Sequence, residues 1–171
     1  LQRDAASNAC LYGVLNRTTT PMGARLLRDW LTQPLADGEA IRQRQAAVRA
    51  WVEHPDLLAT FRGCLNEVRD LERTLTRLSV GTGNGRDLRQ LRLALQQLPS
   101  MKELLHETIA AAAYDGQTSE LELHDRAETT PLFELLDREL APLPELVDLV
   151  QCAIVDEPPA VLKDGGLIRD G

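Results

Sequence analysis

The stretch of this sequence that most invites a chemical interpretation is the glycine-rich run GTGNG, residues 81–85. Glycine-rich P-loops cradle phosphates, but they continue with a lysine and a hydroxyl residue that hold the phosphates and Mg²⁺. Arg86 and Asp87 follow here instead. A dinucleotide-binding loop follows a strand, whereas the residues before this run carry leucines at helical spacing. The run therefore predicts a turn between helices, and we assign no cofactor-binding residue.

The cysteines, histidines and clustered acids are the other candidates for catalysis or metal binding. The cysteines and histidines show no CxxC pair and no other metal-ligand spacing, and no local pattern pairs a nucleophile with a base. The acids of residues 120–128 lie in a polar stretch, which is typical of a solvated loop and not of enclosed catalytic carboxylates. We predict no catalytic residue and no metal ligand among Cys10, Cys64, Cys152, His54, His106, His124, Glu120, Glu122, Asp125 and Glu128.

Charge is distributed unevenly along the 171 residues. Residues 1–100 carry a net charge of +4 and residues 101–171 carry −11, which together give −7. Nucleic-acid binding normally uses a concentrated basic face, so we expect this chain alone to bind DNA weakly. No apolar run approaches the length of a membrane span, and three widely spaced cysteines favour a reducing compartment. These features predict a cytoplasmic location and no membrane partner.

The elements that position these residues are predicted to be helices. Apolar residues recur at helical spacing from Pro21 to about Ile154, which indicates an all-α fold in a single domain, residues 1–171. Thr20 is a predicted N-cap with Pro21 at the first helical position, and Asp37 is the next N-cap. The expected helices cover about 21–33, 37–54, 57–65, 70–80, 88–98, 100–113, 131–140 and 146–154.

Some details of these helices are specific enough to test. Two predicted apolar faces consist of Ile41, Val48 and Val52 in the second helix and of Leu71, Leu75 and Leu78 in the fourth. Pro99 is expected to close one helix, and Ser100 with Glu103 forms the capping box of the next. Polar residues 114–129 are expected to form a surface insertion. In VLKDGGLI, residues 161–168, an Asp-Gly pair between β-prone runs predicts a hairpin or tight turn.

Five stretches, in order, resemble the segment that opens the core, or lever, domain (domain III) of the MutS family of DNA mismatch-repair proteins. Residues 11–37, LYGVLNRTTTPMGARLLRDWLTQPLAD, match the family pattern around T-x-T-P-M-G-x-R. Residues 41–48 (IRQRQAAV), 70–78 (DLERTLTRL), 85–99 (GRDLRQLRLALQQLP) and 163–171 (KDGGLIRDG) match later motifs. We take as structural signature residues Thr20, Pro21, Met22, Gly23, Arg25, Trp30, Asp70, Leu71, Glu72, Arg73, Arg86 and Asp87.

The resemblance implies a mechanical role. A multi-helix core/lever domain would couple DNA bound at one end of a longer protein to ATP hydrolysed at another. We expect the chain, which begins at Leu1, to be an excised piece whose partners are the connector, clamp and ATPase domains. By resemblance, the longer protein is a homodimeric, DNA-dependent ATPase that uses ATP and Mg²⁺ and binds mismatched double-stranded DNA. We expect no enzymatic activity and no bound cofactor in this chain itself.

Three positions carry particular expectations from the resemblance. Arg25 either bridges to carbonyls or a carboxylate at the junction of connector, core helices and ATPase, or it is solvated. Gly23 is expected to permit close backbone approach by another element. Gly85 stands where the family usually has proline, so a looser helix start is expected there.

Other functions fit the same residues. The chain could be a helical scaffold or protein-interaction module, either in a non-ATPase homologue of MutS or in a paralogue of the recombination-type branch. The T-P-M-G stretch favours the mismatch-repair branch. A Walker A loop downstream would exclude a scaffold without ATPase activity, and a Phe-x-Glu motif upstream would mark the mismatch-repair branch.

Overall fold

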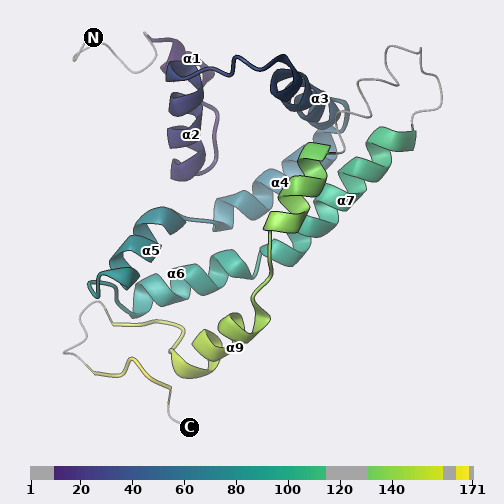
Figure 1. The fold of residues 1–171 in the computed structure, drawn as a ribbon. Helices are drawn as coiled ribbons and strands as arrows, with labels where there is room; N and C mark the ends of the chain where they lie inside the picture. The colour runs from purple at the N-terminus through teal and green to yellow at the C-terminus, as the bar shows by residue number, and fades with distance from the viewer. Residues whose placement is uncertain (1–9, 115–130, 160–164, 170–171) are drawn as a thin grey trace.

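The computed structural model describes residues 10–114, 131–159 and 165–169, which fold almost entirely as helices (Figure 1). The predicted all-α class is confirmed. The helices are α1 (Leu11–Leu15), α2 (Pro21–Thr32), α3 (Gly38–Glu53), α4 (Pro55–Glu67), α5 (Leu71–Ser79), α6 (Gly85–Leu95), α7 (Leu98–Tyr114) and α9 (Pro144–Ala153), and residues 131–139 form a further helix between α7 and α9.

Side-chain caps fix where several helices begin. The Thr20 hydroxyl accepts a hydrogen bond from the Gly23 N–H at 3.0 Å, and the Asp37 carboxylate accepts from the first-turn N–H groups of α3. Both predicted N-caps are therefore confirmed. These bonds satisfy backbone donors that a helix cannot pair internally. The five-residue helix α1 was not predicted, since its LYGVL sequence is too short to show a helical period.

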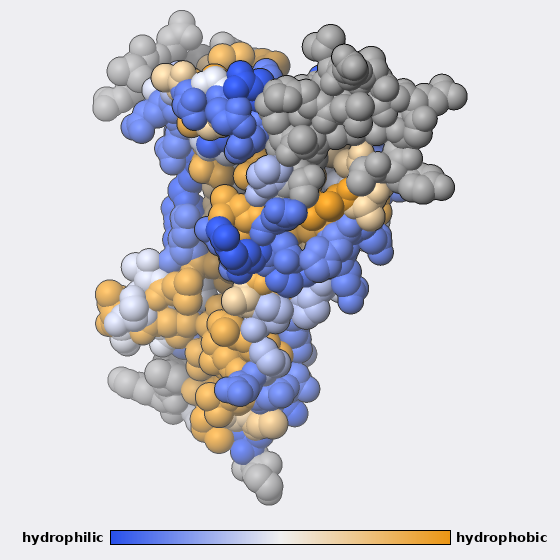
Figure 2. Space-filling model, turned by 45° about the vertical axis from the view of Figure 1, so that its right-hand side comes forward, coloured by the Kyte–Doolittle hydropathy of each residue, from blue (hydrophilic) through white to orange (hydrophobic). Residues whose placement is uncertain are grey.

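Two long rows of helices lie side by side (Figure 1). The helices α4 and α5 form one row and α6 and α7 form the other, with α4 packed on α7 and α5 packed on α6. At the upper end, α3 and the 131–139 helix pack around this pair. At the lower end, α9 packs against α6. The hydrophobic surface in Figure 2 is concentrated at the level of α9, where Leu143, Leu149 and Ile168 are exposed.

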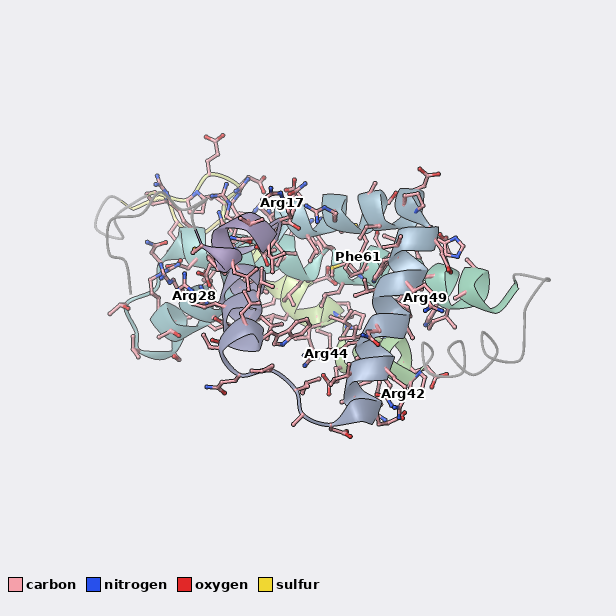
Figure 3. All side chains as sticks on the ribbon, turned by 90° about the horizontal axis from the view of Figure 1, so that it is seen from above. Arg17, Arg28, Arg42, Arg44, Arg49 and Phe61 are labelled. Carbon is pink, nitrogen blue, oxygen red and sulfur yellow. The ribbon has the colours of Figure 1, made fainter. Side chains whose placement is uncertain are left out.

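The main core lies at the upper end, between α3, α4, α7 and the 131–139 helix. It is built on Ala47, Ala50, Leu105 and Phe133, all less than 9% exposed. Trp51 lies between two rings, with centroids 5.1 Å from Phe61 and 5.6 Å from Phe133. Figure 3 shows Phe61 directed from α4 toward this core. The small alanines of α3 let these large aromatic side chains fill the interior.

The predicted helix faces were partly wrong. In α3 the buried residues are Ala46, Ala47 and Ala50, while Val48 and Val52 are 60% and 69% exposed. In α5 the buried residue is Thr74, and Leu75 is 50% exposed. In both helices a small residue is buried while a larger apolar residue is exposed, so hydrophobicity alone did not identify the buried face.

The predicted boundary at Pro99 was also wrong. Helix α6 ends at Leu95 and α7 begins at Leu98, so Pro99 lies in the first turn of α7. A proline is tolerated there because its missing N–H would have no partner within the helix. Ser100 therefore lies inside α7 and does not act as its N-cap. The predicted capping box with Glu103 is not formed.

The C-terminal segment returns beside the end of α9. Ile154 and Ile168 form an antiparallel bridge, in which Val155 donates to the Leu167 carbonyl at 3.1 Å and Arg169 donates to the Ala153 carbonyl at 2.9 Å. Gly165 has a φ of 70°, in the region that favours glycine. Residues 167–169 thus pair with 153–155, and the other half of the predicted hairpin, with the Asp164 turn position, lies outside the described residues. The same holds for 115–129 of the predicted insertion.

Candidate functional site

Arg25 joins two helices that are far apart in the sequence. Its guanidinium nitrogens donate to the Asp70 carboxylate at 2.8 and 2.7 Å, and one of them also donates to Glu72. Asp70 is the N-cap of α5 and Glu72 lies in its first turn. A bidentate arginine–carboxylate pair fixes geometry as well as charge, so it holds α2 against the start of α5. Arg25 thus bridges to a carboxylate within this chain, while its contact with another domain stays a prediction.

Asp70 is bound from two sides. Besides the Arg25 pair, its carboxylate accepts from the Arg73 N–H at 3.4 Å, which caps α5, and the Arg73 side chain lies 3.5 Å away. The hydrogen bonds from Arg25 lower the pKa of Asp70 to about 2, with a smaller contribution from the Arg73 N–H and against an opposing effect of burial. The bonds to Asp70 and then to Glu72 raise the pKa of Arg25. Asp70 and Arg25 are therefore both ionised at neutral pH.

A second ion pair joins α5 to α6. The Arg77 Nε donates to Asp87 at 3.0 Å, and a terminal nitrogen of Arg77 donates to the same oxygen. The other Asp87 oxygen accepts from the Asn84 N–H at 3.1 Å, while the Asn84 side chain accepts from the Asp87 N–H, which completes a capping box. The bond from Arg77, followed by that from the Asn84 backbone, lowers the pKa of the buried Asp87.

The start of α6 is closely packed, contrary to the looser start expected for Gly85. Gly85 is buried, and a Cβ there would overlap Leu167 and lie 2.9 Å from the Pro158 Cβ. Arg86 donates from its Nε to the Pro158 carbonyl at 3.1 Å. The Asn84 cap, together with the Leu167 and Pro158 side chains, takes the place of the proline found elsewhere in the family pattern.

These pairs border a surface cleft of about 700 Å³ between α2, α5 and α6. Half of the twelve signature residues line it, namely Pro21 and Arg25 from α2, Asp70 and Arg73 from the start of α5, and Arg86 and Asp87 from α6. Residues as far apart in sequence as Pro21 and Asp87 therefore meet at one place. This convergence makes the cleft our candidate functional site.

The other signature residues surround or lie away from this cleft. Thr20 caps α2, Glu72 completes the Arg25 cluster, and Met22 and Leu71 are half-buried. Trp30 lies at the far end of α2, 42% exposed, with Arg44 stacked 3.8 Å from its ring centroid. At Gly23, the atoms nearest to an added Cβ belong to Thr20, at 3.1 Å, and to Thr18. Within the described structure the crowding at Gly23 comes from the capping loop, and a further element packing there stays a prediction.

The sequence prediction did not single out Arg77 and Asn84. Asn84 could have been found, because an asparagine followed three residues later by an acid is a helix-start pattern. Arg77 lies in the matched stretch 70–78, but its partner Asp87 is ten residues away across a turn. No periodic pattern identifies such a pair.

The glycine-rich run forms a turn, as predicted. Gly81 has a φ of 73°, and the Gly83 N–H donates to the Arg77 carbonyl at 2.8 Å. A Cβ on Gly83 would lie 2.6 Å from Leu78 Cδ2, so the turn packs closely on α5 at this glycine. Among the described residues, no three His, Cys, Asp or Glu side chains gather in a metal-binding arrangement. None of the described helices is long and apolar enough to cross a membrane.

Comparison with known proteins extends over the whole chain. The family model described as MutS domain III matches residues 1–170. The chain is 41% identical to the DNA mismatch repair protein MutS of Symbiobacterium thermophilum and 40% identical to that of Myxococcus xanthus, each over 169 residues. The MutS of Methanosarcina barkeri is 38% identical. Each alignment covers 99% of this chain but only 17% of the relative.

Proposed function

The chain belongs to the MutS family, in which it corresponds to domain III, and from this we infer that it is one helical domain of a longer DNA mismatch-repair ATPase. Its role is mechanical: it couples DNA binding by other parts of the longer protein to ATP hydrolysis by the ATPase domain. The relatives named above, which are described as DNA mismatch repair proteins, support this assignment over a recombination-type paralogue. The chain spans about a sixth of their length, consistent with one domain among several.

The observation that carries this proposal is the ion-pair cluster of Arg25, Asp70 and Glu72. Coupling between distant sites requires rigid elements whose relative placement can change between discrete states. Helix α2 buries none of its residues and is held on α5 largely by this cluster, whereas the two helical rows share apolar contacts. A small displacement at the α2–α5 contact therefore disturbs ion pairs without exposing a buried side chain of α2.

ATP and Mg²⁺ are proposed for the longer protein, at a site outside this chain. The glycine-rich turn lacks the lysine of a P-loop, and Leu78 and Leu167 occupy the space beside its glycines. The proposed partners are mismatched DNA, a second copy of the longer protein, and its connector, clamp and ATPase domains. We also propose a cytoplasmic location, because three widely spaced cysteines favour a reducing compartment.

The test uses the longer protein with the substitution Asp70→Asn, which removes the charge that pairs with Arg25. Three quantities are measured: affinity for G·T-mismatched duplex without nucleotide, basal ATP hydrolysis, and the change in ATP hydrolysis caused by mismatched DNA. We expect the first two to change less than about threefold, while the DNA-dependent change falls by about tenfold, the order of a 1.4 kcal/mol coupling.

The matched control is Arg138→Gln, on the exposed side of the 131–139 helix, which should alter none of the three. Equal losses of binding, basal hydrolysis and coupling in Asp70→Asn would show that the cluster only maintains the fold. A longer protein without a Walker A loop would favour the scaffold function instead.

A further inference from the structure

The cleft between α2, α5 and α6 carries more positive charge than its own acids neutralise. Five arginines and two aspartates line it. Arg25 is paired with Asp70, and Arg77 is paired with Asp87. Glu72, beside the cleft, also accepts from Arg25. Five arginines against Asp70, Asp87 and Glu72 leave a local surplus of about two positive charges, carried by Arg69, Arg73 and Arg86.

Each of these three side chains has guanidinium N–H groups that can donate hydrogen bonds to a bound anion. Arg69 is exposed and has no hydrogen bond or ion pair within the described part of the chain. Arg73 is 75% exposed and only its Nε approaches Asp70, at 3.5 Å. Arg86 uses its Nε for the Pro158 carbonyl, which leaves its terminal nitrogens. Asn66 and Gln90 add neutral amide groups to the same walls.

The other arginine-rich face of the molecule is already occupied by internal partners. Figure 3 shows Arg17 and Arg28 on the α1–α2 side and Arg42, Arg44 and Arg49 along α3. Arg28 stacks over Tyr12 at 4.8 Å, Arg44 stacks on Trp30, and Arg42 pairs with Glu39 at 2.6 Å. Those arginines are spread over separate elements, and none of them lines either of the two pockets described in this part of the chain. The cleft between α2, α5 and α6 is the described pocket that gathers several arginines at one place.

We propose that this cleft binds a short acidic segment of protein, whose glutamate or aspartate carboxylates pair with Arg69, Arg73 and Arg86. A guanidinium group matches a carboxylate in a bidentate geometry, and a single extended chain can reach into a space of about 700 Å³. A DNA duplex carries its phosphates on a stiff, wide surface, so it can contact only the rim. Only the origin of the segment, another domain of the longer protein, rests on the proposed function.

Occupancy of the cleft would act on the α2–α5 joint. Arg73 contributes its N–H to the Asp70 carboxylate and its side chain to the cleft wall. A carboxylate bound to Arg73 competes with Asp70 for that side chain, so the bound segment changes how firmly Asp70 holds Arg25. The structure thus supplies a route by which an acidic partner biases the placement of α2.

The test is a calorimetric titration of this chain with hexaglutamate at low salt. Hexaglutamine serves as the uncharged control peptide. We expect saturable binding of one hexaglutamate and none of hexaglutamine. The double variant Arg69→Gln/Arg73→Gln should weaken binding about tenfold or more, since it removes two charge-assisted pairs. Neither side chain packs in the core, so the urea midpoint of the double variant should stay near that of the unaltered chain.

The control variant Arg138→Gln/Arg49→Gln carries the same change in charge away from the cleft and should bind hexaglutamate as the unaltered chain does. Absence of saturable binding, or an equal loss in both double variants, would overturn the proposal. Tighter binding of inorganic phosphate or of a duplex oligonucleotide at Arg69 and Arg73 would overturn it in favour of a phosphate site. The coupling function is measured in the longer protein through Asp70→Asn, so either proposal can fail alone.

Discussion

Asp70 combines a helix cap, a salt bridge and a low pKa in one carboxylate. Its N-cap bond orients α5, and its pair with Arg25 positions α2. Because these bonds favour the ionised form, the carboxylate has a pKa of about 2 in the folded chain, against about 3.9 for an unperturbed aspartate. The stability it contributes is fully present above pH 4 and is lost as the pH falls toward 2.

The corresponding prediction concerns acid unfolding. Between pH 5 and pH 2.5 the free energy of unfolding should fall less steeply in Asp70→Asn than in the unaltered chain, because the amide cannot take up the proton. Urea titrations at several pH values measure this slope. Asp29→Asn is the control, since that exposed side chain has no ion pair among the described residues. Identical slopes in Asp70→Asn and the unaltered chain would contradict the pairing.

The surroundings of Gly85 and Gly63 predict that a glycine-to-alanine substitution has opposite effects on stability at the two positions. At Gly85 a Cβ would overlap Leu167 and press on Pro158, so Gly85→Ala should destabilise the chain by about 1–3 kcal/mol, as overpacked cores do. At Gly63, inside α4, no atom lies within 4 Å of an added Cβ, so Gly63→Ala should stabilise by about 0.5–1 kcal/mol. Urea unfolding of both variants decides this, and the same sign for both would refute the described packing.

At the scale of single helices, α2 and α7 are held in different ways. No residue of α2 is buried, and its ties to the rest include Arg25 with Asp70 and the stacking of Arg44 on Trp30. The described side chains of α7 that are buried are Met101, Leu104, Leu105 and Thr108. Charged and exposed contacts are screened by salt and are weaker than apolar burial. The α2 segment should therefore open locally without global unfolding.

Hydrogen exchange tests this difference. The amides of α2 should exchange at least about tenfold faster than those of α7, and the substitution Asp70→Asn or a high salt concentration should widen the gap by accelerating α2 alone. The α7 amides serve as the internal control. Equal protection of α2 and α7, or equal acceleration of both, would show that α2 is an integral part of the main fold.

The sequence predicted the helices better than it predicted their partners. Caps such as Thr20 and Asp37 are local signals, because the donor and acceptor lie within three residues of each other. The buried alanines of α3 could not be foreseen, since a periodicity of large apolar residues points to Val48 instead. The pairing of Arg25 with Asp70 joins residues forty-five positions apart. The family resemblance marked both residues, but only the fold brings them together.

At the scale of the whole molecule, charge and apolar surface are arranged along the two helical rows. The lower end carries the basic cleft and, around α9, the exposed hydrophobic residues of Figure 2. The upper end carries the aromatic core and the arginines of Figure 3, most of which already have internal partners. The cleft proposed for an acidic segment therefore lies beside α2, where Arg25 of α2 meets Asp70 at the start of α5.

This charge distribution predicts how the chain alone behaves with DNA. Affinity for the DNA backbone needs several cations on one face, whereas the +4 of residues 1–100 is opposed by −11 in the remainder. Reading a mismatch needs side chains inserted into a groove or between bases. Trp51, Phe61 and Phe133 are committed to the core, and the more exposed Trp30 is covered by the stacked Arg44. Binding to matched and G·T-mismatched duplexes should therefore be weak and equal, and it should vanish near physiological salt, where the Debye length is about 8 Å. Titrations at two salt concentrations measure both properties. Submicromolar binding that prefers the mismatch would mean that this domain itself recognises DNA, and its assignment as a purely mechanical element would then be wrong.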